Sequence, residues 1–478
     1  MISAIVIPIV FIAMIILWLW NKVDQMLVSL GGAIISIFSL LIDGTTFSDI
    51  LGFFFGTPEN DFINFHSLLL SLGMLFMINT CQETGVFSYL AFKLVQTTGG
   101  NRYQLFIILS ILAFMFSAIL NNILAVLLFI PLIITICKIL KINPIPYIIS
   151  ISILVNLGSI LFAISSVPNI LISTHTGWTF STFFIQVGLF AFILILVSSI
   201  FLSGYYKKNL EKPNKKLLMV LKEYDAWIFV TNRRNFYKSL IVLITSIILF
   251  IFLPLFTPIT IDIIAISGGI LLIFLTANDE LTSLMRRMDF ELVFYLIGVF
   301  FVVDALSFTG ALNFVSEWLI FISQGNLLIS SLIILWLSSG LSSLMNNTPV
   351  TKIMIPAIDK LATRFAINPN IIFTSLAYGT NLGDNLTPWG DNLVAMKISS
   401  NYKRPINFWK FFKIGVLATV IQLFATTIYL IIIINPQFLL IGVLILLAIS
   451  ITIILIYFHK GIYKVIKEFI NNTLNRIR

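Results

Sequence analysis

Two pairs of adjacent asparagines interrupt long apolar stretches, and they are the first residues in the sequence that could do chemistry. They are Asn121-Asn122 within 103–140, and Asn346-Asn347, followed by Thr348, within 327–362. A helix that stops inside a membrane leaves carbonyls unpaired, and a helix that restarts there leaves N–H groups unpaired. Asparagine can cap such ends, while its remaining oxygen or amide binds a cation or an anion. Both stretches are therefore predicted to be re-entrant hairpins, whose asparagines either cap the helices or also face a ligand.

Two further apolar segments, 146–173 and 371–398, contain clusters of Gly, Pro and polar residues. The candidate substrate- or ion-binding residues in these clusters are Asn156, Gly158, Ser159, Asn169, Asn381, Gly383, Asp384, Asn385, Thr387 and Asp391. Gly and Pro at this density do not sustain a regular helix. Each segment is therefore predicted to be two half-helices, whose N-termini favour an anion and whose free carbonyls favour a cation.

Three ionisable residues fall within these apolar regions: Lys352, Asp384 and Asp391. An ionisable group at membrane depth is costly, so each is a functional hypothesis. Lys352 holds an anionic substrate, replaces a bound cation, forms a structural pair with an aspartate or reaches back to the outer membrane interface. Either aspartate could take up Na⁺ or H⁺ and couple transport to an ion gradient. Sites for Na⁺ are predicted at Asn122, Asn347, Asp384 and Asp391; no other metal and no organic cofactor is predicted.

These features occur twice in one register. A shift of 225 residues, which is the difference between positions 73 and 298, superposes several uncommon groups. They are Gly73 on Gly298, Asn121-Asn122 on Asn346-Asn347, Asn143-Pro144 on Asn368-Pro369, and Asn156-Leu157-Gly158 on Asn381-Leu382-Gly383. The same shift places Asp384, Asp391 and Lys352 on Ser159, Ser166 and Leu127. An odd number of predicted spans separates equivalent points, so the second copy is expected to be inverted, as in secondary transporters with a site near the midplane.

The composition places the chain in a membrane. Of 478 residues, 59% are hydrophobic and only 10% are charged, and apolar runs long enough to cross a bilayer recur throughout. We predict an all-α membrane protein with about 11 transmembrane helices plus two re-entrant hairpins, in two inverted repeats with broken helices. The net charge of +9 arises from short basic loops. Their distribution predicts a multi-pass plasma membrane protein with the N-terminus outside and the C-terminus cytoplasmic.

The predicted organisation follows the repeats. The segments are N-terminal spans 1–65, repeat one 66–205, a basic cytoplasmic linker 206–238, connecting spans 239–290, repeat two 291–434, and a C-terminal span with a basic tail 435–478. The expected partners are the lipid bilayer and a small inorganic or organic ion, and a homodimer is compatible with the sequence. Nucleic acid is not expected, because basic loops beside membrane spans are normal. The sequence contains neither an HExxH helix nor a Walker A loop, so an enzyme is not expected.

At the hairpins and broken segments the sequence resembles the ion transporter superfamily. The resemblance is strongest to the arsenite permease and sodium/proton antiporter branch, with citrate-transporter-like proteins and divalent anion/sodium symporters as relatives. It spans roughly residues 66 to 434. The motifs that carry it are Asn346-Asn347-Thr348-Pro349-Val350, Asn381-Leu382-Gly383, Leu386-Thr387-Pro388-Trp389-Gly390 and Asn143-Pro144. The resemblance implies two hairpins and two broken helices around one central site, with ions on either side.

These observations predict a secondary active transporter of a small anion, of the arsenite/oxyanion or carboxylate type, that is ion-coupled or driven by membrane potential. The two Asn-rich hairpins and Lys352 favour an anion as substrate. Asp384 and Asp391 instead favour a sodium/proton antiporter, which is the alternative. An ion channel is a third hypothesis, because a channel would use the same polar lining without alternating access.

Overall fold

The computed structural model describes most of the chain up to residue 438. The described residues are 2–20, 23–58, 62–97, 101–120, 122–276, 285–286, 288, 290–388 and 390–438, and the side chains of Lys215, Leu218 and Asp391 are not described. The predicted tip residue Asn121, Trp389 of the second break, and nearly all of the predicted last span and basic tail therefore lie outside the described residues.

Every regular element in the described ranges is a helix. The helices before the repeats are α1 (Ser3–Trp20), α2 (Gln25–Ile42) and α3 (Phe47–Phe55). In predicted repeat one (66–205), which begins within the first helix of this group, lie α4 (Ile63–Glu83), α5 (Val86–Val95), α6 (Arg102–Ser117), α7 (Asn122–Leu140), α8 (Ile145–Gly158), α9 (Val167–Thr176), α10 (Phe180–Phe183), η2 (Phe184–Gly188) and α11 (Leu189–Tyr205). The predicted linker (206–238) contains α12 (Lys215–Glu223), η3 (Ala226–Phe229) and the start of α13 (Arg233–Phe256), and α14 (Ile261–Thr276) follows. Repeat two contains α16 (Glu291–Phe308), α17 (Asn313–Ser323), α18 (Leu327–Ser342), α19 (Asn347–Phe365), α20 (Asn370–Gly383), α21 (Asp391–Asn401) and α22 (Phe408–Ile434), with η4 (Pro436–Phe438) after it.

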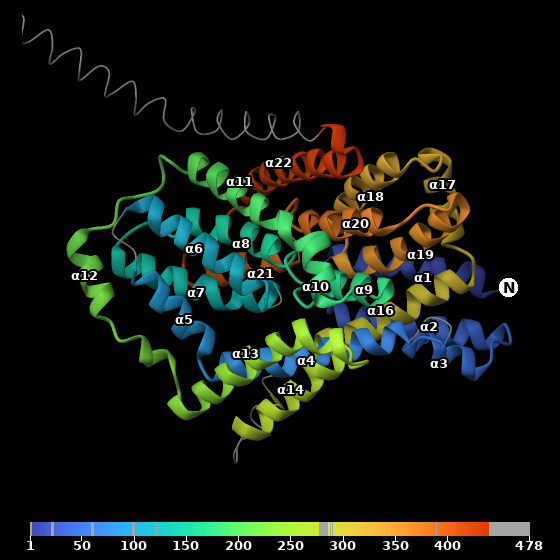
Figure 1. Ribbon diagram of the computed structural model, residues 1–478, viewed down its shortest axis with the longest axis horizontal. Helices are drawn as coiled ribbons and strands as arrows, with labels where there is room; N and C mark the ends of the chain where they lie inside the picture. Colours follow the sequence, from blue (N-terminus) through green and yellow to red (C-terminus); the bar gives the residue numbers. More distant parts are fainter. Residues whose placement is uncertain are drawn as a thin grey trace, which may run out of the picture.

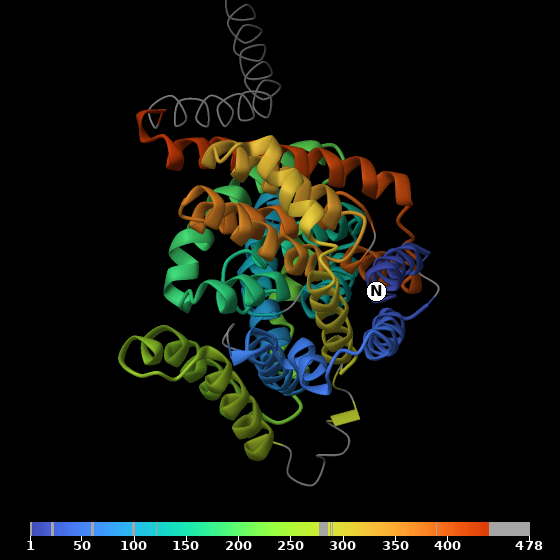
Figure 2. The same cartoon turned by 90° about the vertical axis from the view of Figure 1, so that its right-hand side faces the viewer.

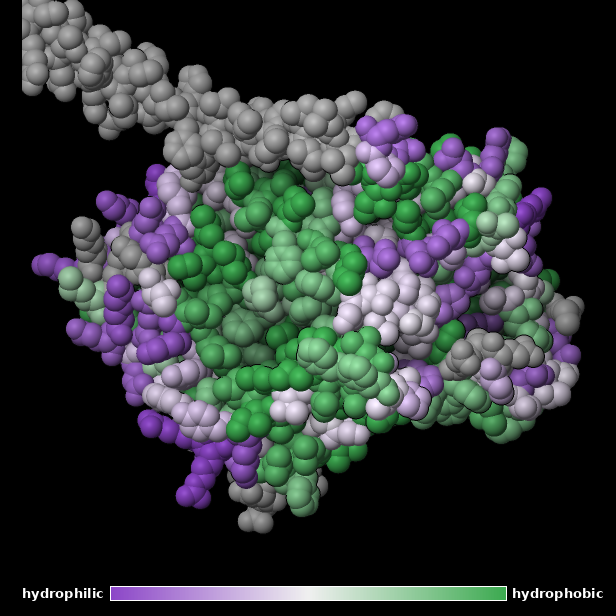
Figure 3. Space-filling view, viewed as in Figure 1, coloured by the Kyte–Doolittle hydropathy of each residue, from purple (hydrophilic) through white to green (hydrophobic). Residues whose placement is uncertain are grey.

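The surface has the polarity of a membrane protein. Among the described helices, 8 are long and apolar enough to cross a bilayer: α1, α2, α4, α7, the continuous run Phe180–Tyr205, α13, α16 and α22. Large apolar side chains such as Phe274 and Phe256 are more than four-fifths exposed. On the face shown in Figure 3, apolar residues cover the middle and polar residues gather toward the two ends. Such a band suits contact with lipid rather than water, so the chain is a multi-pass helical membrane protein.

The helix bounds repeat with the predicted register. Adding 225 to the bounds of α6, α7 and α8 reproduces the bounds of α18, α19 and α20. The helical segments around 146–173 and 371–398 are both interrupted, between α8 and α9 and between α20 and α21, as the Gly, Pro and Asn clusters predicted. The two hairpins, α6–α7 and α18–α19, each reverse at an asparagine-containing tip.

Paired glycines allow the tightest helix contacts. A Cβ on Gly73 would collide with the backbone of Ala265 and Ile266 on α14, and a Cβ on Gly298 would collide with the backbone of Ser29 on α2. The long helices α4 and α16 therefore pack closely on α14 and α2. Around this packing, α13 and α14 lie along one side of the molecule and α22 along the other (Figures 1 and 2).

Glycines also bring the breaks to the hairpins. A Cβ on Gly158, the last residue of α8, would meet the backbone of Phe114 on α6, and a Cβ on Gly383, the last residue of α20, would meet that of Ser339 on α18. Both glycines were predicted as site residues. Each lets a broken helix lie against the first arm of its hairpin, so that the break comes beside the hairpin tip.

Candidate functional site

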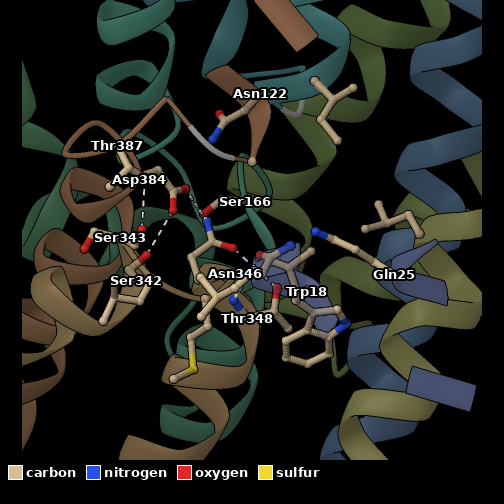
Figure 4. A pocket seen from close by; sticks show the side chains of 18 of the residues that line it. Trp18, Gln25, Asn122, Ser166, Ser342, Ser343, Asn346, Thr348, Asp384 and Thr387 are labelled. Atoms are coloured by element: carbon tan, nitrogen blue, oxygen red, sulfur yellow. Dashed lines mark hydrogen bonds between the residues drawn. The ribbon is translucent and has the colours of Figure 1, made fainter. Parts of the chain in front are cut away.

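A cavity of about 120 Å³ lies between the hairpin tips, the breaks and the N-terminal helices (Figure 4). Its polar lining combines predicted and unpredicted residues. The predicted ones are Asn122, Asn346, Asn347, Thr348, Asp384 and Thr387, and the others are Trp18, Gln25, Ser165, Ser166, Ser342 and Ser343. Asp384 is the only charged residue among the described side chains that line this cavity. Both repeats and the N-terminal helices α1 and α2 thus contribute to one cavity.

The carboxylate of Asp384 is held by donors from the second hairpin. Ser342 Oγ donates to Oδ1 at 2.9 Å, and Asn347 Nδ2 donates to Oδ2 at 2.9 Å. Asp384 follows directly after α20, so it lies on the non-helical backbone of the break. Because Asn347 Nδ2 donates to Asp384, the Oδ1 atom of Asn347 faces away from that carboxylate, toward Thr348 Oγ1 at 3.5 Å. The carboxylate and this amide oxygen are both suitable ligands for a hard cation.

Side-chain bonds fix the backbone of the second break. Asn392 Nδ2 donates to the carbonyls of Asp384 (2.7 Å) and Thr387 (3.3 Å), which spans the non-helical turn. Thr387 Oγ1 donates to the carbonyl of Ser343 at 2.9 Å, and Ser342 Oγ donates to the carbonyl of Thr380 at 2.7 Å. The break and the tip of α18–α19 are therefore tied together, as buried polar backbone at membrane depth requires.

The first break is fixed in the same way but carries no carboxylate. Asn169 Nδ2 donates to the carbonyls of Ser159 (2.7 Å) and Phe162 (3.0 Å), which are equivalent to Asp384 and Thr387. Asn169 thus occupies the position of Asn392, and 392 minus 169 is 223 rather than 225. The second break is shorter than the first, so the 225-residue shift no longer pairs equivalent residues after the breaks. Asp391 is therefore not the structural equivalent of Ser166. Asp391 is the first residue of α21.

The remaining predicted asparagines join the two breaks to each other instead of lining the cavity. Asn156 Nδ2 donates to Asn385 Oδ1 at 2.9 Å, and Asn381 Nδ2 donates to Asn169 Oδ1 at 2.9 Å. Ser159 Oγ donates to Asn381 Oδ1 at 3.1 Å. All five residues are at most 1% exposed. A buried network with most of its polar atoms satisfied makes the packing of the two repeats specific.

Lys352 lies outside the cavity. Its Nζ is 3.1 Å from Asp304 Oδ1 and donates to Asn64 Oδ1 at 2.6 Å, and Asn64 Nδ2 donates to Asp304 Oδ2 at 2.7 Å. Of the roles predicted for Lys352, the geometry corresponds to the structural pair. The partner is Asp304 on α16, because α19 packs against that helix. Sequence reasoning did not include Asp304 or Asn64 among the site residues.

Several lining residues were missed by sequence reasoning for different reasons. Ser342 and Ser343 lie just before the Asn-Asn pair, and Ser342 repeats Ser117 at the 225-residue shift, so the register offered a signal for them. Trp18 and Gln25 lie before the repeats and have no counterpart in the register. Nothing in their local sequence places them at the site.

Within the described ranges, no group of three or more His, Cys, Asp or Glu side chains could hold a metal. Two of the histidines form pairs instead: His66 Nδ1 is 2.9 Å from Asp262, and His175 Nε2 is 2.9 Å from Asp359.

Comparison with known proteins identifies relatives along most of the chain. A family model described as citrate transporter (CitMHS) matches residues 15–379. A 46 kDa membrane protein of Mycobacterium leprae is 26% identical over 374 residues, covering 77% of this chain and 86% of that protein. An uncharacterized transporter of Mycobacterium tuberculosis is 26% identical over 429 residues, covering 88% and 96%. The human P protein is 23% identical over 434 residues, covering 74% of this chain and 52% of that protein.

Solved structures share the fold at low identity. The YdaH transporter of Alcanivorax borkumensis aligns with a TM-score of 0.55 and 12% identity, covering 80% of this chain and 86% of that one. MtrF of Neisseria gonorrhoeae, described as illuminating a class of antimetabolite efflux pumps, aligns with a TM-score of 0.55 and 12% identity, covering 83% and 84%. At this identity the likeness concerns the fold alone.

Proposed function

Because the chain belongs to the citrate transporter family and is therefore a secondary transporter, we propose that it carries a small carboxylate anion together with a cation held at Asp384. The family match favours a carboxylate over an arsenite-type oxyanion. The charge of the cavity supports the coupling to a cation, and this charge is the observation on which the proposal depends.

The described lining of the cavity carries one negative charge and no positive charge. Lys352, the residue predicted to be able to hold an anion, is already paired with Asp304. A substrate carboxylate about 4 Å from Asp384 would meet a repulsion on the order of 4 kcal/mol at an effective dielectric constant of 20. A proton or Na⁺ at Asp384 removes this repulsion. The anion then binds only when the cation is present, which is the requirement for coupled transport.

The proposed ligands for this cation are the Asp384 carboxylate and the Asn347 amide oxygen. The first repeat has the equivalent asparagine, Asn122, but its break offers Ser159, whose hydroxyl is bonded to Asn381. The cation is therefore assigned to the second repeat. A role for Asp391 remains part of the proposal, because α21 begins at that residue beside the break.

We also propose the membrane arrangement: two inverted repeats, re-entrant hairpins, the N-terminus outside and the C-terminus cytoplasmic in the plasma membrane. The repeated helix bounds and the distribution of basic residues support it. The half-helix α8, with 14 residues, is about 21 Å long and cannot cross a bilayer core of about 30 Å alone. A homodimer stays a prediction.

A second candidate, sodium/proton exchange, is favoured by the same carboxylate. Asp384 could bind Na⁺ and H⁺ in competition, with no anion transported. The two functions differ in whether cation flux needs a carboxylate on the same side of the membrane.

The test is flux into proteoliposomes with citrate, succinate, sulfate, arsenite or no anion, with Na⁺ and proton movement measured together. We expect citrate uptake that depends on a cation gradient in the wild type; Asp384→Asn, which lacks the repelling charge, should take up citrate only down its own gradient and without dependence on the cation. Glu317→Gln, an exposed acidic site beside Lys360, is the matched control and should retain uptake. Uptake by Asp384→Asn that still depends on the cation gradient would contradict the coupling role. Na⁺/H⁺ exchange without any anion would favour the second candidate.

A further inference from the structure

We propose that Trp18, Gln25 and Ser166 form an uncharged subsite that binds the third carboxylate of a tricarboxylate substrate, the one that a dicarboxylate such as succinate lacks. This inference rests on the proposed carboxylate transport and adds where the far end of the substrate is held. The three residues lie on the cavity lining together with Asp384, and two of them belong to helices outside the repeats.

Two of the three residues are buried and have a polar atom with no partner in the described structure. Trp18 is 6% exposed, and its indole Nε1–H makes no hydrogen bond. Ser166 is 7% exposed, and its Oγ makes none. Most buried polar groups in proteins are hydrogen-bonded, and each exception destabilises the fold. Two such exceptions on one small cavity indicate a ligand that completes their bonds.

The positions of Trp18 and Gln25 are set by contacts away from the cavity. The Trp18 ring meets Tyr295 of α16 edge to face, with ring centroids 6.0 Å apart. Asp24 caps α2 by accepting from Met26 N at 2.8 Å, which places Gln25 on the first turn of the helix. Figure 4 shows the Gln25 side chain extending from α2 toward the hairpin tip, above Trp18.

The donor types define the group that this subsite binds. An indole N–H can only donate, so the ligand must present an acceptor to Trp18. The Ser166 hydroxyl and the Gln25 amide can donate to the same group. A carboxylate has two oxygens that accept several such bonds, and bonds from neutral donors to a charged acceptor are stronger than bonds between neutral groups. Uncharged donors can therefore recognise the anion while Asp384 holds its cation in the same cavity.

The experiment compares citrate with succinate, which has one carboxylate fewer. Binding is measured on the purified full-length protein with a saturating coupling cation, for wild type, Trp18→Phe, Gln25→Leu and Ser166→Ala. Trp18→Phe keeps an aromatic ring against Tyr295 and removes the N–H donor together with part of the ring volume. Trp20→Phe is the matched control, because Trp20 is exposed and does not line the cavity.

We expect wild type to bind citrate more tightly than succinate. Each subsite variant should weaken citrate about tenfold, the effect of losing one hydrogen bond to a charged group, while changing succinate less than about twofold. Trp20→Phe should match the wild type. Equal losses for both ligands, no loss for either, or no wild-type preference for citrate would overturn the subsite. If wild type binds neither ligand, the proposed function itself fails. If wild type binds citrate but the subsite variants do not weaken it selectively, only the subsite fails.

Discussion

Replacing Asp304 tests whether Lys352 stabilises the structure or binds the substrate. The side chains of Lys352 and Asp304 are 12% and 25% exposed, and both also bond to Asn64. Removing one partner of a buried ion pair leaves the other charge uncompensated, at a cost of about 3–5 kcal/mol. Because this pair keeps some exposure, we expect Asp304→Leu to cost about 3 kcal/mol, a large share of the stability of a typical domain.

The double variant Asp304→Leu/Lys352→Met supplies the decisive comparison. It removes both charges and keeps similar volume, so most of the lost stability should return; Asn64 keeps its bond to the Phe53 carbonyl, and its unpaired amide oxygen leaves a deficit of about 1 kcal/mol. The assay is thermal unfolding in detergent together with citrate uptake in proteoliposomes. We expect the single variant to have a clearly lower Tm and the double variant to have nearly wild-type Tm and uptake. A double variant that is stable but does not bind citrate would refute this reasoning and make Lys352 a substrate ligand.

Three further predictions follow from the packing and the surface. Asn392→Ala leaves the carbonyls of the second break unpaired, so we expect a loss of about 2 kcal/mol and strongly reduced uptake, measured by Tm and flux. Gly73→Ala and Gly298→Ala place a Cβ against backbone rather than against a flexible side chain, and both should sharply lower the yield of folded protein in size-exclusion chromatography. Hydrogen bonds from Ser3 hold the pKa of Asp43 below its usual value. The ionised Asp43 therefore stabilises the folded state above the unfolded pKa near 4, and this stabilisation is lost as pH falls through the folded pKa. In pH-dependent melts, the Tm of Asp43→Asn should not show this acid-dependent decrease.

The local elements could be predicted from the sequence because their causes are local. Gly, Pro and Asn clusters stop helices whatever surrounds them, so both breaks were predicted at the right places. The hairpin tips followed from asparagines within apolar runs, and Asn346 does cap α19 by accepting from Thr348 N. The 225-residue register then gave the equivalence of three pairs of helices, whose bounds it reproduces.

The sequence did not determine how the predicted polar residues divide between the cavity and the interface. Asn122 and Asn347 line the cavity, whereas Asn156 and Asn381 bond across the two breaks. All four occur in similar apolar contexts in the sequence. What separates them is the rotation of each half-helix about its axis after the repeats dock.

By itself, the sequence determined that this protein is a helical membrane protein, that its helices break and turn at defined residues, and that the pattern occurs twice. Only the tertiary structure decided which charges meet. Lys352 binds Asn64, which is 288 residues away in the chain, and Asp304, and Trp18 and Gln25 close the cavity from outside the repeats. Helix formation depends on neighbouring residues, but these contacts depend on the depth and rotation at which distant helices pack, and no local pattern encodes those quantities.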